Sequence, residues 1–239
     1  MADNEIGGPP PAVLFDIDGT LVDSNYLHIH AWQRAFAEIG IEVETWRIHR
    51  SIGMDGSTLV RSFSDDAPDS TQKRLKDLHS QFYAEMAPLL RPLPGARTLL
   101  HRVADLGLQV VFATSAPDDE LALLRKVLDS DDLVSAITSA ADVDTAKPKP
   151  DIIHVALERA GVSADRAVFV GDAVWDAEAC ARAHVTSIGV LSGGVSRGEL
   201  EKAGAVMVFE NADDLLKHID DTPIARLLTK EKGPSPISD

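Results

Sequence analysis

The sequence predicts an α/β protein in which a doubly wound parallel sheet carries an all-helical insertion. Short, continuous apolar runs recur along the chain, as expected for strands that are buried on both faces of a parallel sheet. Helical patterns lie between the later runs, which is typical of right-handed βαβ units. One long interval after the first run has helical patterns only. Together these observations predict a Rossmann-like core with an inserted helical domain.

The first predicted strand is Ala12–Phe15, and its apolar side chains follow a leader rich in glycine and proline. Similar apolar runs follow at residues 109–113, 167–170, 187–190 and 205–209. The helical stripes between them end at glycines, such as Gly107 and Gly161, which commonly terminate helices. This alternation assigns residues 1–23 and 94–221 to the α/β core.

The helical insertion is expected at residues 24–93. One apolar stripe at helical spacing runs from Leu27 to Ile39 and a second from Leu75 to Met86. The insertion begins just after the first strand, at the sheet edge where doubly wound proteins bind ligands, so we expect it to form a cap. The C-terminal residues 222–239 contain three prolines and little periodicity, which predicts a mobile tail.

The composition excludes several classes of protein. A hydrophobic fraction of 44% and a charged fraction of 26% are typical of a soluble globular chain, and no apolar run is long enough for a membrane-spanning helix. A net charge of −15 argues against nucleic acid and against an anionic membrane surface as partners. It also opposes a phosphorylated ligand unless a bound cation reverses the local field.

The compartment is expected to be the cytoplasm. The first residues contain acids and no base, unlike a secretory signal. The single cysteine, Cys180, excludes an intramolecular disulfide, and we expect it to be a buried apolar side chain.

Two acidic motifs follow apolar runs. Asp16 and Asp18 follow the first run and precede Gly19, while Asp172 and Asp176 follow the run at 167–170. Each motif taken alone is also compatible with a solvated turn. Together, oxygen ligands that converge from two strand ends suit a hard cation such as Mg²⁺. Paired carboxylates can also divide the work of nucleophile and proton carrier.

Two further polar residues stand at comparable places. Thr114 follows the run at 109–113, and Lys147 lies in an Ala-Lys-Pro-Lys-Pro segment before a predicted helix. In this order the motifs resemble those of the haloacid dehalogenase-like hydrolases that carry a helical cap. Asp16-x-Asp18-Gly19-Thr20 is similar to the first motif, Thr114 to the second, Lys147 to the third, and Gly171-Asp172 with Asp176 to the fourth. The resemblance covers residues 12–219.

The resemblance implies phosphoryl transfer through an aspartyl-phosphate, with magnesium as the cofactor. Asp16 would attack phosphorus and also bind the metal. Asp18 would exchange protons with the leaving group and with water, while its backbone carbonyl binds the metal. Thr114 and Lys147 would hold the phosphoryl oxygens. The remaining implied roles are a metal ligand (Asp172), a residue supporting the metal or the lysine (Asp176), and substrate contacts (Gly19, Thr20 and Ser115).

Specificity is expected to come from the insertion, because the core residues meet only the phosphoryl group. Residues 48–54 are similar to the substrate-facing segment of phosphoglycolate phosphatase-like caps. Arg50 is therefore a candidate contact for a carboxylate or second phosphate, with a surface salt bridge as the equal alternative. His28 and His30 lie on different faces of one predicted helix. At most one of them can reach the cleft, and a surface position is expected for each.

The function expected from these residues is a magnesium-dependent phosphatase for a small phosphorylated metabolite, phosphoglycolate-like or sugar-phosphate-like. One alternative is a mutase resembling beta-phosphoglucomutase, and another is a catalytically silent binding protein on the same fold. The presence of Asp18 disfavours a dehalogenase. Lys73 and Lys76 are expected on a charged surface, which disfavours a Schiff-base lysine. The sequence does not indicate the oligomeric state.

Overall fold

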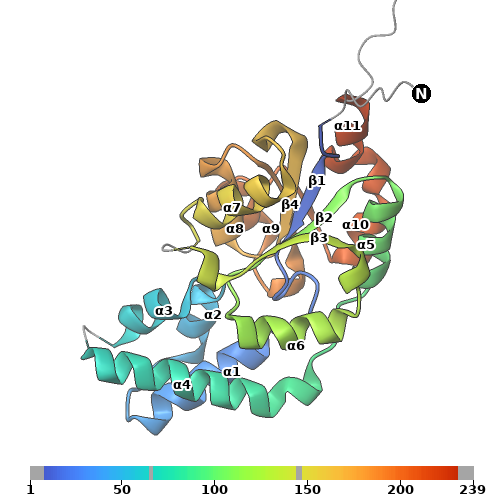
Figure 1. The fold of residues 1–239 in the computed structure, drawn as a ribbon. Helices are drawn as coiled ribbons and strands as arrows, with labels where there is room; N and C mark the ends of the chain where they lie inside the picture. The colour runs from blue at the N-terminus through green and yellow to red at the C-terminus, as the bar shows by residue number, and fades with distance from the viewer. Residues whose placement is uncertain (1–7, 65–66, 144–146, 231–239) are drawn as a thin grey trace, which may run out of the picture.

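The computed structural model describes residues 8–64, 67–143 and 147–230. Its centre is a single sheet of parallel strands in the order β3-β2-β1-β4-β5-β6, which confirms the predicted α/β class (Figure 1). The strands are β1 (Ala12–Phe15), β2 (Gln109–Ala113), β3 (Val134–Thr138), β4 (Ala167–Gly171), β5 (Thr186–Val190) and β6 (Met207–Phe209).

The strand order reverses at β1, which pairs with β2 on one side and with β4 on the other. In open α/β sheets a crevice forms at such a reversal, outside the carboxyl ends of the strands. The backbone N–H of Asp16, the first residue after β1, donates to the carbonyl oxygen of Val170 in β4 at 3.0 Å. The first acidic motif therefore stands at the reversal point.

The core has two apolar layers, one on each face of the sheet. Val13 and Phe15 of β1 belong to one buried cluster, and Ala12 and Leu14 belong to the other. This alternation follows from the two-residue repeat of a strand. The helices of the core are α5 (Ala96–Asp105), α6 (Asp118–Leu128), α7 (Asp151–Ala160), α8 (Val174–Arg182), α9 (Arg197–Ala203), α10 (Ala212–Lys217) and α11 (Pro223–Lys230). Short 3₁₀ helices occur at Ala87–Leu89, Asp131–Leu133, Ala140–Asp142, Ala164–Arg166, Leu191–Gly193 and Ile219–Asp221.

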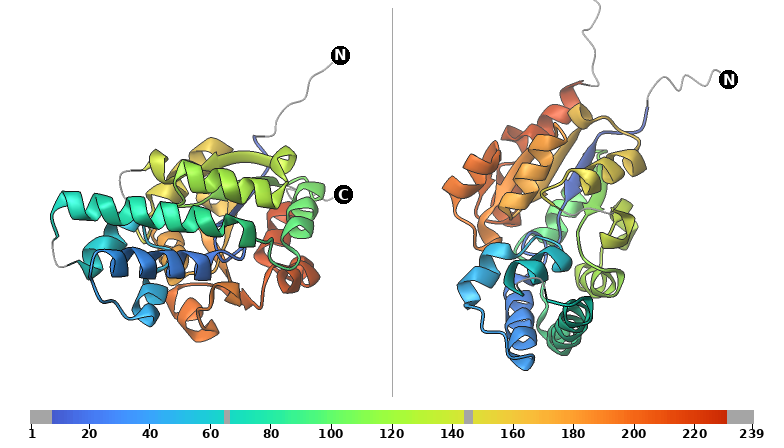
Figure 2. Two further views of the ribbon diagram at one scale, coloured as in Figure 1. Left: turned by 90° about the horizontal axis from the view of Figure 1, so that it is seen from below. Right: turned by 90° about the vertical axis from the view of Figure 1, so that its left-hand side faces the viewer.

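The insertion after β1 is helical, and its helices gather at the carboxyl ends of the strands (Figures 1 and 2). They are α1 (Asn25–Glu38), α2 (Thr45–Ser51), α3 (Gly56–Phe63) and α4 (Asp69–Met86). The chain enters and leaves this region side by side: the backbone N–H of Asp23 donates to the carbonyl oxygen of Arg91, and that of Leu93 to the carbonyl oxygen of Leu21, both at 2.9 Å. The division into a core and a cap at residues 24 and 93 stays a prediction.

The C-terminal part departs from the sequence prediction. Residues Pro223–Lys230 form the helix α11, in which Ile224 and Leu227 are buried, so a mobile tail from residue 222 was wrong for this stretch. The apolar residues of this helix span only about one turn, which is too short a pattern to predict a helix from the sequence. The backbone N–H of Ile224 donates to the hydroxyl of Thr222 at 3.2 Å and caps the helix. The rest of the predicted tail, 231–239, lies outside the described residues.

Two smaller expectations concern burial and membranes. Cys180 is buried on α8, as predicted. Within the described part of the chain, no helix combines the length and the hydrophobicity needed to span a bilayer.

Candidate active site

Lys147 connects the two acidic motifs. Its Nζ lies 2.8 Å from Oδ1 of Asp16 and 2.7 Å from Oδ1 of Asp176, and only 3% of the lysine is exposed. The other oxygen of Asp176 accepts from the backbone N–H of Ala173 at 3.1 Å. Asp176 therefore holds the lysine and the start of α8 at once, which suits a supporting role.

Asp172 completes a cluster of three buried carboxylates. The donor oxygens of Asp16, Asp172 and Asp176 lie within 4.8 Å of one another. The hydroxyl of Thr20 donates to Oδ1 of Asp172 at 2.9 Å, and the amide of Asn25 donates to Oδ2 at 2.8 Å. These neutral donors orient the Asp172 carboxylate without neutralising its charge.

Two glycines allow the backbone to approach Asp172. A Cβ at Gly19 would lie 2.4 Å from Oδ2 of Asp172, and Gly19 also has a φ of +69°. A Cβ at Gly193 would lie 1.7 Å from the same oxygen. Both positions thus require glycine on steric grounds, and Gly19 requires it for its backbone conformation too. The sequence motif that contains Gly19 is in this way part of the site, while Gly193 is a contribution that sequence reasoning missed.

The electrostatics of this cluster call for a further cation. Burial raises the pKa of Asp16 to about 7, against the opposing effect of Lys147, and burial with the neighbouring Asp176 and Asp16 raises the pKa of Asp172 well above its usual value. Burial disfavours the ammonium of Lys147, but Asp16 and Asp176 outweigh it and raise its pKa. The cluster thus contains three carboxylates, of which two contact the single lysine. An all-oxygen donor set with this charge fits a hard divalent cation such as Mg²⁺.

Asp18 is directed away from this cluster. The hydroxyl of Ser24 donates to its Oδ1 at 2.5 Å, and Nε2 of His28 lies 3.2 Å from the same oxygen. Burial favours the neutral acid, but His28 and Ser24 outweigh it and lower the pKa of Asp18. The carboxylate of Asp18 therefore contacts Ser24 and His28 rather than the cluster of carboxylates. A metal contact through the backbone carbonyl of Asp18 stays a prediction.

A cavity of about 820 Å³ opens over these residues, between the core and the insertion. The core contributes five of the predicted site residues to its wall, namely Asp16, Asp18, Thr114, Ser115 and Lys147. Thr114 is itself buried, and its hydroxyl accepts from the backbone N–H of Ala116 at 3.1 Å. Thr20 is directed to Asp172 instead, so the structure gives it a supporting position and no place on the cavity wall among the described residues.

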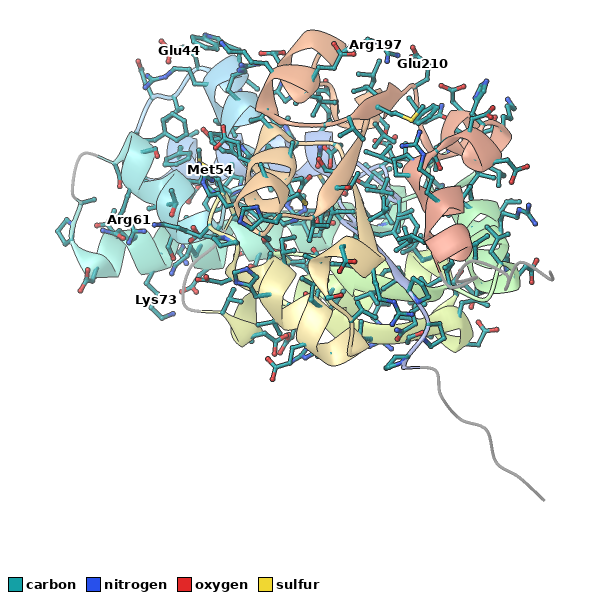
Figure 3. All side chains as sticks on the ribbon, turned by 90° about the horizontal axis from the view of Figure 1, so that it is seen from above. Glu44, Met54, Arg61, Lys73, Arg197 and Glu210 are labelled. Atoms are coloured by element: carbon teal, nitrogen blue, oxygen red, sulfur yellow. The ribbon has the colours of Figure 1, made fainter. Side chains whose placement is uncertain are left out.

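The insertion supplies the opposite wall, and of the two alternatives for Arg50 the structure shows the surface salt bridge. The guanidinium of Arg50 pairs with Oε1 of Glu199 on α9 at 2.5 Å, and Arg50 does not line the cavity. The surface salt bridge was thus the correct alternative. The basic residues on this wall are Arg61 and Lys76, from α3 and α4. Figure 3 labels Arg61 and Met54, which also lines the cavity, on the helical side of the molecule.

The structure also corrects the prediction for His28, which is buried, whereas His30 is exposed as expected. His28 precedes Trp32 by four residues and therefore shares the buried face of α1. That spacing was a signal in the sequence. Further along, His79 of α4 and Glu120 of α6 are buried beside His28, and the sequence reasoning identified neither.

The site thus combines a parallel sheet of this order, a buried lysine and a carboxylate cluster at its reversal point, and a helical insertion over them. A family model for haloacid dehalogenase-like hydrolases matches residues 13–190. The chain belongs to this family.

Individual relatives agree with that assignment. A phosphoglycolate phosphatase from Rhodospirillum rubrum is 33% identical over 218 residues, which cover 84% of this chain and 88% of that protein. A crystal structure of a hydrolase from Pseudomonas syringae matches with a TM-score of 0.85 and 38% identity, over 88% of this chain and 98% of that one. A beta-phosphoglucomutase from Clostridium difficile matches with a TM-score of 0.79 over 92% and 99% of the two chains; at 20% identity this likeness shows the fold alone.

Proposed function

We propose that this chain is a magnesium-dependent phosphatase that hydrolyses a small phosphorylated metabolite through an aspartyl-phosphate intermediate. The observation that carries the proposal is the position of Asp16, a buried carboxylate on the cavity wall that contacts Lys147 and lies beside Asp172 and Asp176. Membership of the hydrolase family and the likeness to a phosphoglycolate phosphatase support the reaction class.

Asp16 is the nucleophile in this proposal. An oxygen of its carboxylate forms a bond to phosphorus while the bond from phosphorus to the leaving oxygen breaks. Lys147 and Thr114, which line the same cavity, hold the phosphoryl oxygens and offset their charge. Asp16, Asp172 and the backbone carbonyl of Asp18 would hold Mg²⁺, with Asp176 in support. When bound, the metal supplies charge neutralisation at the phosphoryl group.

Asp18 carries the proton in both half-reactions. It donates a proton to the leaving oxygen in the first step. In the second step it accepts a proton from the water that attacks phosphorus, so that phosphate leaves and Asp16 is regenerated. The hydrogen bond between Nε2 of His28 and Oδ1 of Asp18 lets a proton reside on either group between these steps.

The substrate's remaining part faces the insertion, which forms the wall opposite the core. Arg61 and Lys76 give this wall two cationic side chains, against one carboxylate, Asp55, which caps α3. This supports a phosphoglycolate-like or sugar-phosphate-like ester whose far end is anionic or rich in hydroxyls. The bound cation and these basic side chains offset the net charge of −15 where the substrate binds. A cytoplasmic location and the absence of nucleic-acid and anionic-membrane partners stay predictions from the sequence.

Phosphate release from a panel of esters tests the proposal. The panel comprises phosphoglycolate, hexose phosphates and nucleoside monophosphates, each assayed with Mg²⁺ and with excess chelator. We expect release that requires Mg²⁺, and a preference within the panel would name the substrate group. Conversion of beta-glucose 1-phosphate to the 6-phosphate without phosphate release would instead support the mutase alternative. No turnover of any ester, with a ligand still bound, would support a silent binding protein.

A further inference from the structure

Four side chains form a continuous chain of contacts from Asp18 into the core. His28 of α1 lies with Nε2 at 3.2 Å from Oδ1 of Asp18, and its Nδ1 lies 3.1 Å from Nε2 of His79 on α4. Nδ1 of His79 in turn lies 3.4 Å from Oε1 of Glu120 on α6. This series of side-chain contacts therefore begins in the loop after β1, passes through two helices of the insertion and ends on a helix of the core.

Aromatic packing fixes both imidazoles of this chain. The ring of His28 stacks on Tyr83 with a centroid distance of 4.0 Å, and the ring of His79 stacks on Trp32 at 4.1 Å. His28, His79 and Glu120 are each at most 9% exposed. All three residues line the cavity with little exposed surface, and each ring nitrogen of the two histidines has a partner within the protein.

While both imidazoles are neutral, all the hydrogen bonds in this series point in the same direction. A neutral imidazole has one N–H donor and one acceptor nitrogen. If Glu120 carries a proton, each group donates toward Asp18, and His28 presents an N–H to the Asp18 carboxylate. If Asp18 carries the proton instead, each group donates toward Glu120. The atom that His28 presents to Asp18 is thus fixed by His79 and, through it, by Glu120.

We infer that His79 and Glu120 are positioning residues for the reaction: they fix the orientation and tautomer of His28, which in turn holds the carboxyl group of Asp18 at the cavity. This inference rests on the proposed function, because it assigns to Asp18 the exchange of protons with the substrate. Glu120 is the anchor at the far end, since the hydroxyl of Ser80 also donates to its Oε1 at 3.4 Å.

A cation at His28, His79 and Glu120 is the competing interpretation of the same residues. One donor atom from each lies within 4.8 Å of the others. However, one ring nitrogen of His79 contacts His28 and the other contacts Glu120, so the side chains point at one another and not at a common centre. This arrangement satisfies the polar atoms without a further ligand.

Leaving-group dependence separates positioning from a merely structural role. An alkyl phosphate needs a proton on its leaving oxygen, whereas p-nitrophenyl phosphate has a leaving group acidic enough to depart without one. We expect His79→Phe and Glu120→Ala to lower kcat/KM, which covers only the steps up to loss of the leaving group, about 10- to 100-fold for the best alkyl ester of the panel. The loss with p-nitrophenyl phosphate should stay below about threefold on the same physical ground. Glu120→Gln, which can still hydrogen-bond to His79, should recover most of the alkyl activity.

Leu78→Ala is the matched control. Leu78 is buried on α4 next to His79 but takes no part in the series of contacts from Asp18 to Glu120. Its truncation should therefore lower stability and leave the ratio of the activities on the two esters unchanged. Equal losses on both esters in His79→Phe and Glu120→Ala, or full alkyl activity in both, would overturn the inference.

Nitrogen NMR of the imidazoles gives a readout that does not depend on turnover. In Glu120→Ala, the ¹⁵N resonances of His79 and of His28 should both shift, and in Leu78→Ala neither should change its tautomer. A change confined to His79 would show that Glu120 has no effect on His28 and would contradict the inference even if the wild-type chain were inactive on every ester. Failure of the proposed function would instead appear as an inactive wild type, so the two failures are distinguishable.

Discussion

Lys147 is the side chain on which the charge balance of the candidate site depends. Its Nζ is the partner of two buried carboxylates, Asp16 and Asp176. Removing one partner of a buried ion pair leaves an uncompensated charge, which costs more than the pair contributes.

We therefore expect Lys147→Met, which keeps most of the apolar stem, to lower the free energy of unfolding by about 3–5 kcal/mol at neutral pH. Turnover should fall by about 10²-fold or more, since a phosphoryl-binding charge is lost. Saturating Mg²⁺ should restore part of the stability, because the cation offsets the same carboxylates. Chemical denaturation with and without Mg²⁺ measures this. A variant as stable as the wild type in the absence of metal would refute the charge balance described here.

Asp18 differs from Lys147 because the role that we propose for it is proton transfer. Asp18→Asn keeps the size of the side chain and removes the exchangeable proton. Turnover should fall by about 10²–10⁴-fold while the fold is unchanged. Steady-state kinetics and circular dichroism check the two parts of this prediction. A change smaller than tenfold would count against the acid–base assignment.

At the scale of single residues, the sequence predicted the core motifs better than the contacts of the insertion. Asp16, Asp18, Thr114 and Lys147 each follow a strand or precede a helix in the chain, and parallel topology brings such positions to one edge. Arg50 offers no comparable rule. Its partner Glu199 is distant in the sequence, so only the folded chain shows that the charge is already paired.

The helices α3 and α4 are the elements expected to set specificity. They place Arg61 and Lys76 on the cavity wall, where no carboxylate of the described chain forms an ion pair with either. Their nearest polar contacts are neutral hydroxyls, those of Thr58 at 3.3 Å and of Ser57 at 3.1 Å.

Replacement of these cations should affect binding rather than chemistry. In the double variant R61A/K76A, we expect KM for an ester with a second anionic group to rise about tenfold or more, with kcat changed much less. Arg50→Ala is the matched control, because that guanidinium is committed to Glu199 outside the cavity. Full kinetics on phosphoglycolate and on a neutral alkyl ester would measure the effect. An unchanged KM in R61A/K76A, or an equal rise in Arg50→Ala, would exclude this wall from substrate recognition.

The sequence predicted the strands that form continuous apolar runs. The strands β1, β2 and β4 are continuous apolar runs, buried throughout or nearly so. The edge strand β3 was missed because it reads Val-Ser-Ala-Ile-Thr and is mostly half-buried. An edge strand has a neighbour on one side only, so fewer of its positions need apolar side chains.

At the scale of the whole molecule, the buried chain from Asp18 to Glu120 links stability to pH. Burial raises the pKa of Glu120 from its ordinary 4.5 to about 7, with Asp18 and Asp119 adding to the shift and His28 and Ser80 opposing it. Neutral His79 is packed against the same carboxyl group. Between about pH 4.5 and 7 the folded chain therefore binds a proton that the unfolded chain has released.

This difference in bound protons gives the sign of the pH dependence of stability. The folded state is favoured below the unfolded pKa, and that contribution is lost as the pH rises through about 7. Between pH 5 and pH 8 the wild type should lose up to about 3 kcal/mol more unfolding free energy than Glu120→Gln, which cannot titrate. Urea denaturation at both values measures the difference between the two proteins. The same pH dependence in both would mean that Glu120 titrates normally.

In the proposed mechanism, Asp16 carries the phosphoryl group during turnover. Acid quenching of the enzyme at steady state with a good ester and Mg²⁺ should preserve the acyl phosphate, and borohydride then reduces an acyl phosphate to an alcohol. Peptide mass spectrometry should find homoserine in place of Asp16 in the turning-over enzyme, and aspartate in enzyme without substrate. Reduction at a different carboxylate, or none despite rapid phosphate release, would contradict the assignment of Asp16 as the nucleophile.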